Sequence, residues 1–139
     1  YDYDKNDGSS HASLYRDVIK DIHKGNPISH SVDIITLDQF LISQNILAVD
    51  LLKIDTEGNE FNVLLGCKAF LRNRKIKAIH FEFNEMNIVS RVSFKNFWDY
   101  LKGRISRFLE RLQKVCPDCG TRNLFPKKFE KVFLNSHPN

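Results

Sequence analysis

One almost continuous apolar run in the chain ends in charged residues, and a predicted helix follows directly after them. The run covers residues 48–55, and its apolar members are Ala48, Val49, Leu51, Leu52 and Ile54. Such a run is typical of a central parallel strand in a sheet with helices on both faces. Residues 60–71 have apolar side chains spaced three and four apart, which predicts an amphipathic helix that Gly66 can interrupt. A second apolar strand at residues 78–83 completes a strand–helix–strand unit, so the sequence predicts an α/β fold with a mostly parallel sheet.

The remaining elements are expected to surround this unit in one domain. Residues 32–36 are β-branched enough for a strand, residues 37–42 predict a short helix, and residues 94–112 predict a longer one. Residues 130–134 are expected to add an edge strand, whereas the polar residues 1–10 predict a loop. A chain of 139 residues with 42% hydrophobic content is long enough for one domain with a core.

Cysteine content and hydropathy indicate the cellular compartment in which the protein is expected. Three cysteines are too few for a disulfide scaffold, which favours a reducing environment. No apolar run approaches the roughly 20 residues of a membrane span, and Tyr1 does not open a signal segment. We therefore expect a cytoplasmic protein without a membrane partner, and the sequence does not indicate its oligomeric state.

Polar side chains follow both strands of the predicted unit, at the edge where open α/β sheets bind ligands. They stand in residues 53–60, KIDTEGNE, and in residues 81–85, FEFNE. Side chains of these types can hold a hydroxyl or ammonium group, act as a general base or bind a hard cation. The candidate site residues are Asp55, Glu57, Glu82 and Asn84.

A structural explanation competes for the acids of the first stretch. Asn59 can cap the following helix, and Glu57 and Glu60 can complement its dipole. For Glu60 we favour the structural role. Asp55 differs because it follows an apolar strand, where its desolvation is poorly explained by capping alone. We therefore expect Asp55 first, Glu57 second and Glu82 third as the acids that contact the ligands.

The chain also resembles a known family over residues 5–100. The run LLKIDTEGNEFNVLLG, residues 51–66, is similar to the FkbM-type methyltransferases, as are TLD at 36–38 and IHFEF at 79–83. Residues 6–10 and the Ser13 and Leu14 that follow resemble the segment that precedes these motifs in the family. The resemblance implies a Rossmann-like class I methyltransferase fold with S-adenosylmethionine as methyl donor. It also implies O-methylation of a hydroxyl on a sugar, glycan or secondary metabolite, so the expected partner is a small-molecule or glycan acceptor.

Members of this family begin with a strand and a glycine-rich turn that holds the donor's methionine part, and an acidic residue follows for its ribose. No such turn follows a strand here, since Gly8 and Gly25 stand in polar stretches. The resemblance therefore implies that residues 1–139 are a C-terminal fragment of the domain, with its N-terminal half missing and a divergent basic tail at residues 101–139. We expect the chain alone to be inactive.

The resemblance also suggests roles for single residues. Asp55 is expected to contact the donor and, with Glu57, to serve catalysis, while Glu82 and Asn84 are placed on the acceptor side. In some class I O-methyltransferases, acids at these strand ends hold Mg²⁺. Asp55, Glu82 and Asn84 would then be its ligands, a subordinate hypothesis because hard cations usually need more carboxylates.

Cys116 and Cys119 form a second constellation, CPDCG, shaped like a zinc-ribbon knuckle. One such pair is half a site, and Cys67 in a predicted helix and His137 in a polar tail do not complete it. A function without zinc and without redox chemistry is therefore favoured.

Basic residues are concentrated late in the chain. Residues 91–139 carry 11 basic and 4 acidic side chains, whereas residues 1–90 carry 10 and 13. A solvated face explains this tail better than nucleic-acid binding does. Two alternatives to a methyltransferase stay open, an inactive remnant that serves as a binding or interaction module and a zinc-knuckle nucleic-acid binder.

Overall fold

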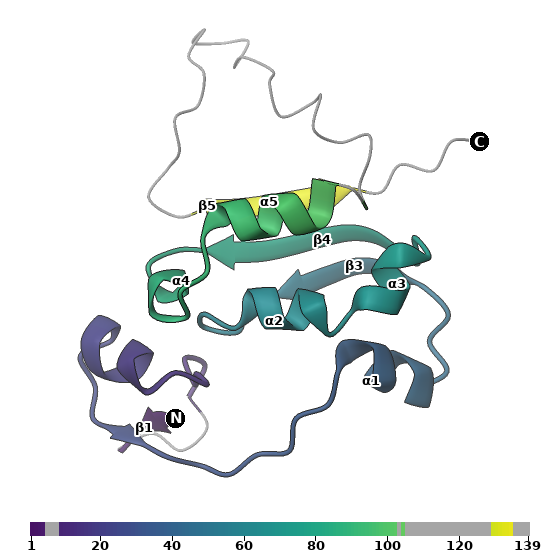
Figure 1. Ribbon diagram of the computed structural model, residues 1–139. Helices are drawn as coiled ribbons and strands as arrows, with labels where there is room; N and C mark the ends of the chain where they lie inside the picture. The colour runs from purple at the N-terminus through teal and green to yellow at the C-terminus, as the bar shows by residue number, and fades with distance from the viewer. Residues whose placement is uncertain (5–8, 103, 105–128, 135–139) are drawn as a thin grey trace, which may run out of the picture.

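The computed structural model describes residues 1–4, 9–102, 104 and 129–134 (Figure 1). Its main sheet has three strands in the order β3–β4–β5. These strands are β3 (Val49–Ile54), β4 (Ile76–Phe83) and β5 (Phe129–Leu134). β3 and β4 are parallel, with Ile54 opposite Phe81, and β5 runs antiparallel to β4. The predicted α/β class, the parallel pair and the late edge strand are confirmed.

Among the described residues, one α-helix precedes β3, and the other α-helices follow β3 or β4 along the chain. They are α1 (Leu37–Ser43), α2 (Glu60–Leu65), α3 (Lys68–Arg72), α4 (Met86–Val89) and α5 (Phe94–Lys102). The helix expected over 60–71 is divided between α2 and α3 at Gly66, as predicted. The longer helix expected from residue 94 is confirmed as far as Lys102, and most of its later part lies outside the described residues.

The TLD motif at residues 36–38 has a structural explanation. Thr36 and Gln39 form a capping box at the start of α1, with Thr36 Oγ1 accepting from the Gln39 amide at 3.2 Å. The Asp38 carboxylate then accepts hydrogen bonds from the backbone amides of Ala69 and Phe70 at 2.7 and 3.1 Å. Asp38 thereby ties α1 to the first turn of α3.

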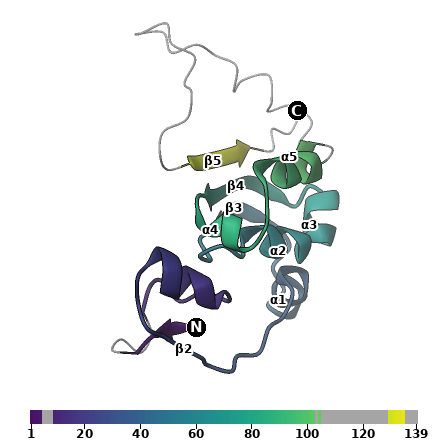
Figure 2. The same cartoon turned by 60° about the vertical axis from the view of Figure 1, so that its left-hand side comes forward.

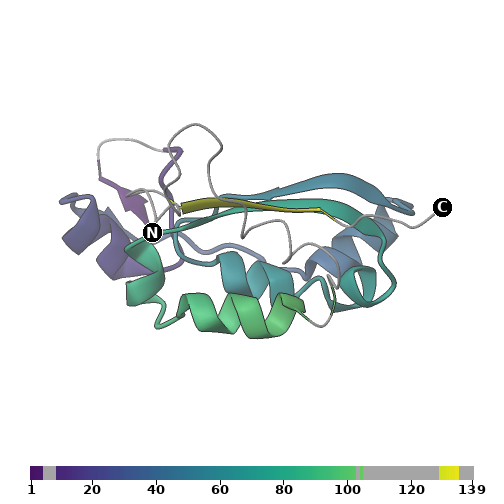
Figure 3. The same cartoon turned by 90° about the horizontal axis from the view of Figure 1, so that it is seen from above.

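The core lies between the sheet and the helices on one of its faces (Figure 3). Phe81 of β4 and Phe97 of α5 stack with their ring centroids 4.5 Å apart, and Phe61 and Phe83 meet Phe97 edge-on. The fully buried Leu64 of α2 completes the contact between sheet and helices. Aromatic packing of this kind stabilises the layer beyond its buried area.

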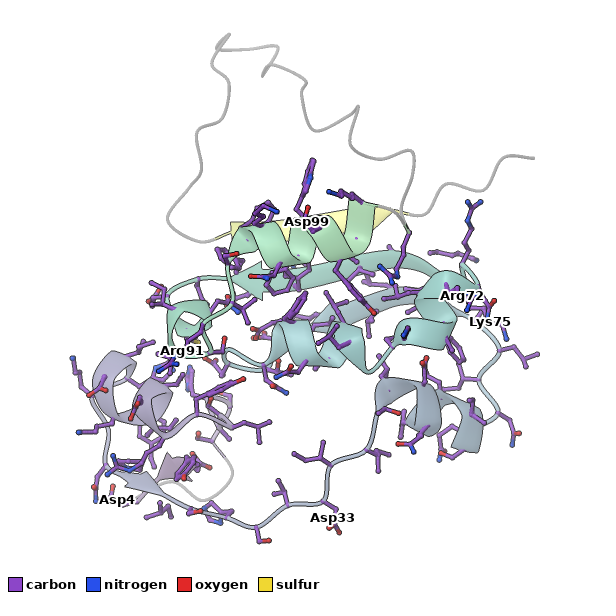
Figure 4. The ribbon with its side chains drawn as sticks, in the orientation of Figure 1. Asp4, Asp33, Arg72, Lys75, Arg91 and Asp99 are labelled. Atoms are coloured by element: carbon purple, nitrogen blue, oxygen red, sulfur yellow. The ribbon has the colours of Figure 1, made fainter. Side chains whose placement is uncertain are left out.

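The position expected for β3 at the centre of the sheet was wrong for the described residues. β3 lies at one edge of the described sheet, and Leu51 on its open face is 57% exposed. An apolar run predicts a strand, but the neighbours of a strand depend on segments elsewhere in the chain. The strand expected at 32–36 was also wrong. These residues form an exposed connection, and Asp33 lies on it away from the sheet (Figure 4). β-branched content favours extended backbone, yet a strand forms only where a partner supplies a ladder.

Residues 1–4 and 9–28 form a small unit beside α4 (Figures 1 and 2). β1 (Asp2–Tyr3) pairs antiparallel with β2 (Pro27–Ile28), and the π-helical turn η1 (Val18–Ile22) lies between them along the chain. The loop expected over residues 1–10 was therefore wrong at Asp2, which is buried and accepts hydrogen bonds from Ser9.

No helix in the described part of the chain is long and apolar enough to cross a membrane.

Replacing Phe97 by alanine should lower the free energy of unfolding by about 3–5 kcal/mol, because the ring is fully buried and stacked on Phe81. Trp98→Ala is the matched control, since this large neighbour on α5 is exposed and its loss should cost much less. Urea denaturation measures both variants. Equal losses would contradict the assignment of the core face of α5.

Candidate active site at the carboxyl end of β3

The carboxylate of Glu60 is buried at the start of α2 and holds the loop after β3 to α4. Its Oε1 accepts hydrogen bonds from the backbone amides of Thr56 and Gly58, both at 3.0 Å, and from the Thr56 hydroxyl at 3.2 Å. Its Oε2 accepts from the Asn87 side-chain amide at 2.9 Å. Only 2% of Glu60 is exposed, so these bonds replace the hydration that the carboxylate loses. The structural role predicted for Glu60 is confirmed.

Glycine is required in the loop that Glu60 holds. Gly58 has a φ of +101°, a left-handed value that other residues rarely adopt. A Cβ at this position would also lie 3.0 Å from the backbone oxygen of Met86. Gly58 therefore allows the loop after β3 to touch the start of α4. Glu57, next to it, is held at a φ of +50°, which is unusual for a residue with a side chain.

Asp55 lies at the end of β3, but it is exposed and not buried as its apolar neighbours suggested. Its carboxylate accepts a hydrogen bond from Lys53 Nζ at 2.8 Å, and 42% of its side chain is exposed. Only one face of β3 packs against the core, so side chains on its other face and at its end are exposed to solvent. Asp55 therefore stands where a ligand can reach it, and its site role stays a prediction.

Glu57 is a half-buried acid in contact with the first segment of the chain. The Ser13 hydroxyl donates to the Glu57 carbonyl oxygen at 2.7 Å, and His23 Nε2 lies 3.4 Å from Glu57 Oε2. Burial raises the pKa of the Glu57 carboxyl, while His23 opposes this increase and the negative charge of Asp55 adds to it. Glu57 thus binds a proton more readily than an exposed glutamate does.

The loop after β4 lies at the same edge of the sheet. Since Ile54 pairs with Phe81, Asp55 and Glu82 each follow a paired position. The Asn84 side chain donates to Glu82 Oε2 and accepts from the Met86 amide, both at 3.0 Å. Asn84 therefore also organises its own loop, and the acceptor-side role predicted for Glu82 and Asn84 stays untested.

The cap predicted at Asn59 was wrong. Asn59 precedes α2 but makes no side-chain cap, and its Oδ1 accepts from Asn62 at 2.8 Å. Glu60 holds the amides of Thr56 and Gly58, which precede the helix and are not the amides that a cap at Asn59 would serve.

Metal sites were also considered in the sequence. Among the residues that the structure describes, no group of three or more His, Cys, Asp or Glu side chains could hold a metal ion. Cys116 and Cys119 lie outside the described residues. Cys67 is buried, and burial raises the pKa of its thiol to about 12, so this cysteine is a core residue.

Sequence reasoning missed the contribution of the first segment to this site. Ser13, Tyr15 and His23 approach the loop at residues 57–62 from more than 30 positions away, and no local periodicity reports such a contact. The similarity of residues 6–10, Ser13 and Leu14 to the family was the one signal that pointed to Ser13.

The fold is of the α/β class, and a polar loop follows β3 at the edge of its parallel strand pair. The family model of the methyltransferase FkbM domain matches residues 2–115. The chain therefore belongs to the FkbM methyltransferase domain family, which confirms the resemblance found in its motifs. Comparisons with curated proteins and with solved structures each gave no match.

Glu60→Gln should lower the free energy of unfolding by about 2–3 kcal/mol. The glutamine side chain replaces one acceptor oxygen by an NH₂ group, which cannot accept the hydrogen bonds that this oxygen receives from buried N–H groups. Glu85→Gln is the control, since Glu85 is an exposed glutamate in the next loop with no capping bond. Thermal or urea unfolding compares the two. A neutral Glu60→Gln would contradict the role assigned to this carboxylate.

Proposed function

We propose that the protein is an S-adenosylmethionine-dependent O-methyltransferase with a Rossmann-like class I fold. Its acceptor is a hydroxyl of a sugar, a glycan or a secondary metabolite. Membership in the FkbM methyltransferase domain family supports the reaction class. The single observation that carries the proposal is the loop at residues 55–58, where two acids leave the end of β3 on a backbone held by buried Glu60.

The side chains of this loop fit ligands rich in hydroxyl groups. Carboxylate oxygens accept hydrogen bonds from hydroxyls, and charge-assisted bonds of this kind are about twice as strong as neutral ones. Asp55 is exposed and held by Lys53, so its free lone pairs would accept from hydroxyls of the donor. Glu82 and Asn84, at the same edge of the sheet, would contact the acceptor.

S-adenosylmethionine supplies an electrophilic methyl group when it is bound. The residues of this chain then have to orient the acceptor oxygen and remove its proton. Orientation alone contributes several kcal/mol to such transfers. The bonds from Glu60 keep the Asp55–Gly58 backbone in one geometry, which is the preorganisation that a positioning site requires.

Asp55→Asn should lower methyl transfer by about 10- to 100-fold in the complete gene product, because the substitution is nearly isosteric and removes the charge of a ligand-contacting acid. Methyl-labelled S-adenosylmethionine and a panel of monosaccharides and hydroxylated small molecules measure the transfer. The unfolding free energy should change little, since an exposed ion pair contributes about 0–1 kcal/mol.

Asp50→Asn is a matched control. Asp50 stands on the same strand and pairs with an exposed lysine, Lys77, at 2.5 Å, but it lies at the amino end of β3. Asp50→Asn should retain the activity of the wild type. If the two variants behave alike, the carboxyl end of β3 is not the ligand site. If the wild type methylates none of the panel, the proposed acceptor class is wrong.

A further inference from the structure

His23 is an imidazole held against an acid of the proposed site. Its Nε2 lies 3.4 Å from Glu57 Oε2, and the two side chains are only 17% and 11% exposed. When Glu57 is ionised, Nε2 carries the proton of this contact, and Nδ1 is then the nitrogen that can accept one. Nδ1 of His23 makes no hydrogen bond with any residue that the structure describes.

Both partners of this pair are held in place by their surroundings. Ser13, which is buried, binds the backbone oxygen of Glu57 at 2.7 Å. The ring of Tyr3 meets His23 edge-on at 6.2 Å, and the ring of His11 lies 5.1 Å away. A carboxylate that orients an imidazole, itself oriented by neighbours, is the arrangement of known general bases.

The proposed reaction needs such a base. A hydroxyl oxygen is a weak nucleophile until its proton is removed. Asp55 is paired with Lys53, and the carboxylate of Glu60 is buried and hydrogen-bonded on both oxygens. We propose that His23 is the proton acceptor for the acceptor hydroxyl and that Glu57 is its positioning residue. This inference rests on the proposed function, and it assigns to the first segment of the chain a direct part in catalysis.

The transfer balances with these groups alone. The acceptor oxygen forms a bond to the methyl carbon, and the bond between that carbon and the donor sulfur breaks. The bonding pair stays on sulfur, which changes from a sulfonium to a neutral thioether. The hydroxyl proton passes to Nδ1 of His23, and the imidazolium that results is stabilised by the carboxylate of Glu57. The histidine later returns this proton to solvent.

The charges around Glu57 allow the pair to be tested without activity. His23 and His11 face it from the first segment and lower the pKa of Glu57, whereas Asp55 raises it from the end of β3. Burial raises the pKa of the nearby Tyr3 phenol, and the negative charges of Glu57 and Asp2 add to this increase. Removing the imidazole should therefore shift the titration of Glu57 to higher pH, and Asp55→Asn should shift it to lower pH.

The activity experiment compares His23→Gln, His11→Gln and His30→Gln in the complete gene product with the same labelled donor and acceptor panel. His23→Gln should lose about 100-fold or more in kcat with donor affinity unchanged, which is the usual contribution of a general base. His30→Gln is the control and should match the wild type, because His30 is exposed in the connection after β2. Glu57→Gln should lose less, and adding it to His23→Gln should lose nothing further.

The second readout is a carbon-13 NMR titration of the Glu57 carboxyl in residues 1–139, for the wild type and for His23→Gln. An upward shift in the variant, together with the loss of kcat, supports the proposal. An unchanged Glu57 titration, a His23→Gln enzyme near wild-type rate, or a loss confined to His11→Gln would each overturn it. A wild type without transfer overturns the proposed function and with it the catalytic role of His23, whereas the titration still reports whether the pair is coupled.

Discussion

The buried carboxylate of Glu60 is the interaction on which the rest of the site depends. It accepts hydrogen bonds from the amides of Thr56 and Gly58 in the loop after β3 and from the side chain of Asn87 in α4, which follows β4. Because these donors come from segments that follow two neighbouring parallel strands, one side chain sets the distance between both segments. A buried charge is tolerated only when it is fully hydrogen-bonded, so the two segments have little freedom to rearrange. Asp55 and Glu57 lie on the loop that Glu60 holds, so the backbone positions of these two acids are fixed as well.

The first segment of the chain also contacts the loop after β3. Ser13 and Tyr15 bind the loop through its backbone and its amide side chains, and His23 approaches the carboxylate of Glu57. Glu57 has a positive φ, a conformation that persists only where its surroundings hold it. The structure therefore connects an unusual backbone at the strand end with a histidine from a distant segment.

Local patterns predicted the elements that carry their own signal. The apolar run at 48–55 and the spacing after Glu60 are properties of contiguous residues, so β3, α2 and their order were accessible from the sequence. The family motif also located Asp55 and Glu57 at a strand end. The burial of Glu60 and the exposure of Asp55 were not accessible in the same way, because both depend on which loops meet around them. His23 was missed for the same reason, since its contact with Glu57 spans 34 positions.

Amide hydrogen exchange at Thr56 and Gly58 tests most directly whether one buried carboxylate builds this site. Both amides lie in a loop, where exchange is ordinarily fast, yet both donate to Glu60 at 3.0 Å. The account predicts that they exchange as slowly as the amides of β4, and that Glu60→Gln accelerates them by more than its loss of global stability explains. Exchange of Thr56 and Gly58 in the wild type at the rate of an unstructured peptide would contradict it.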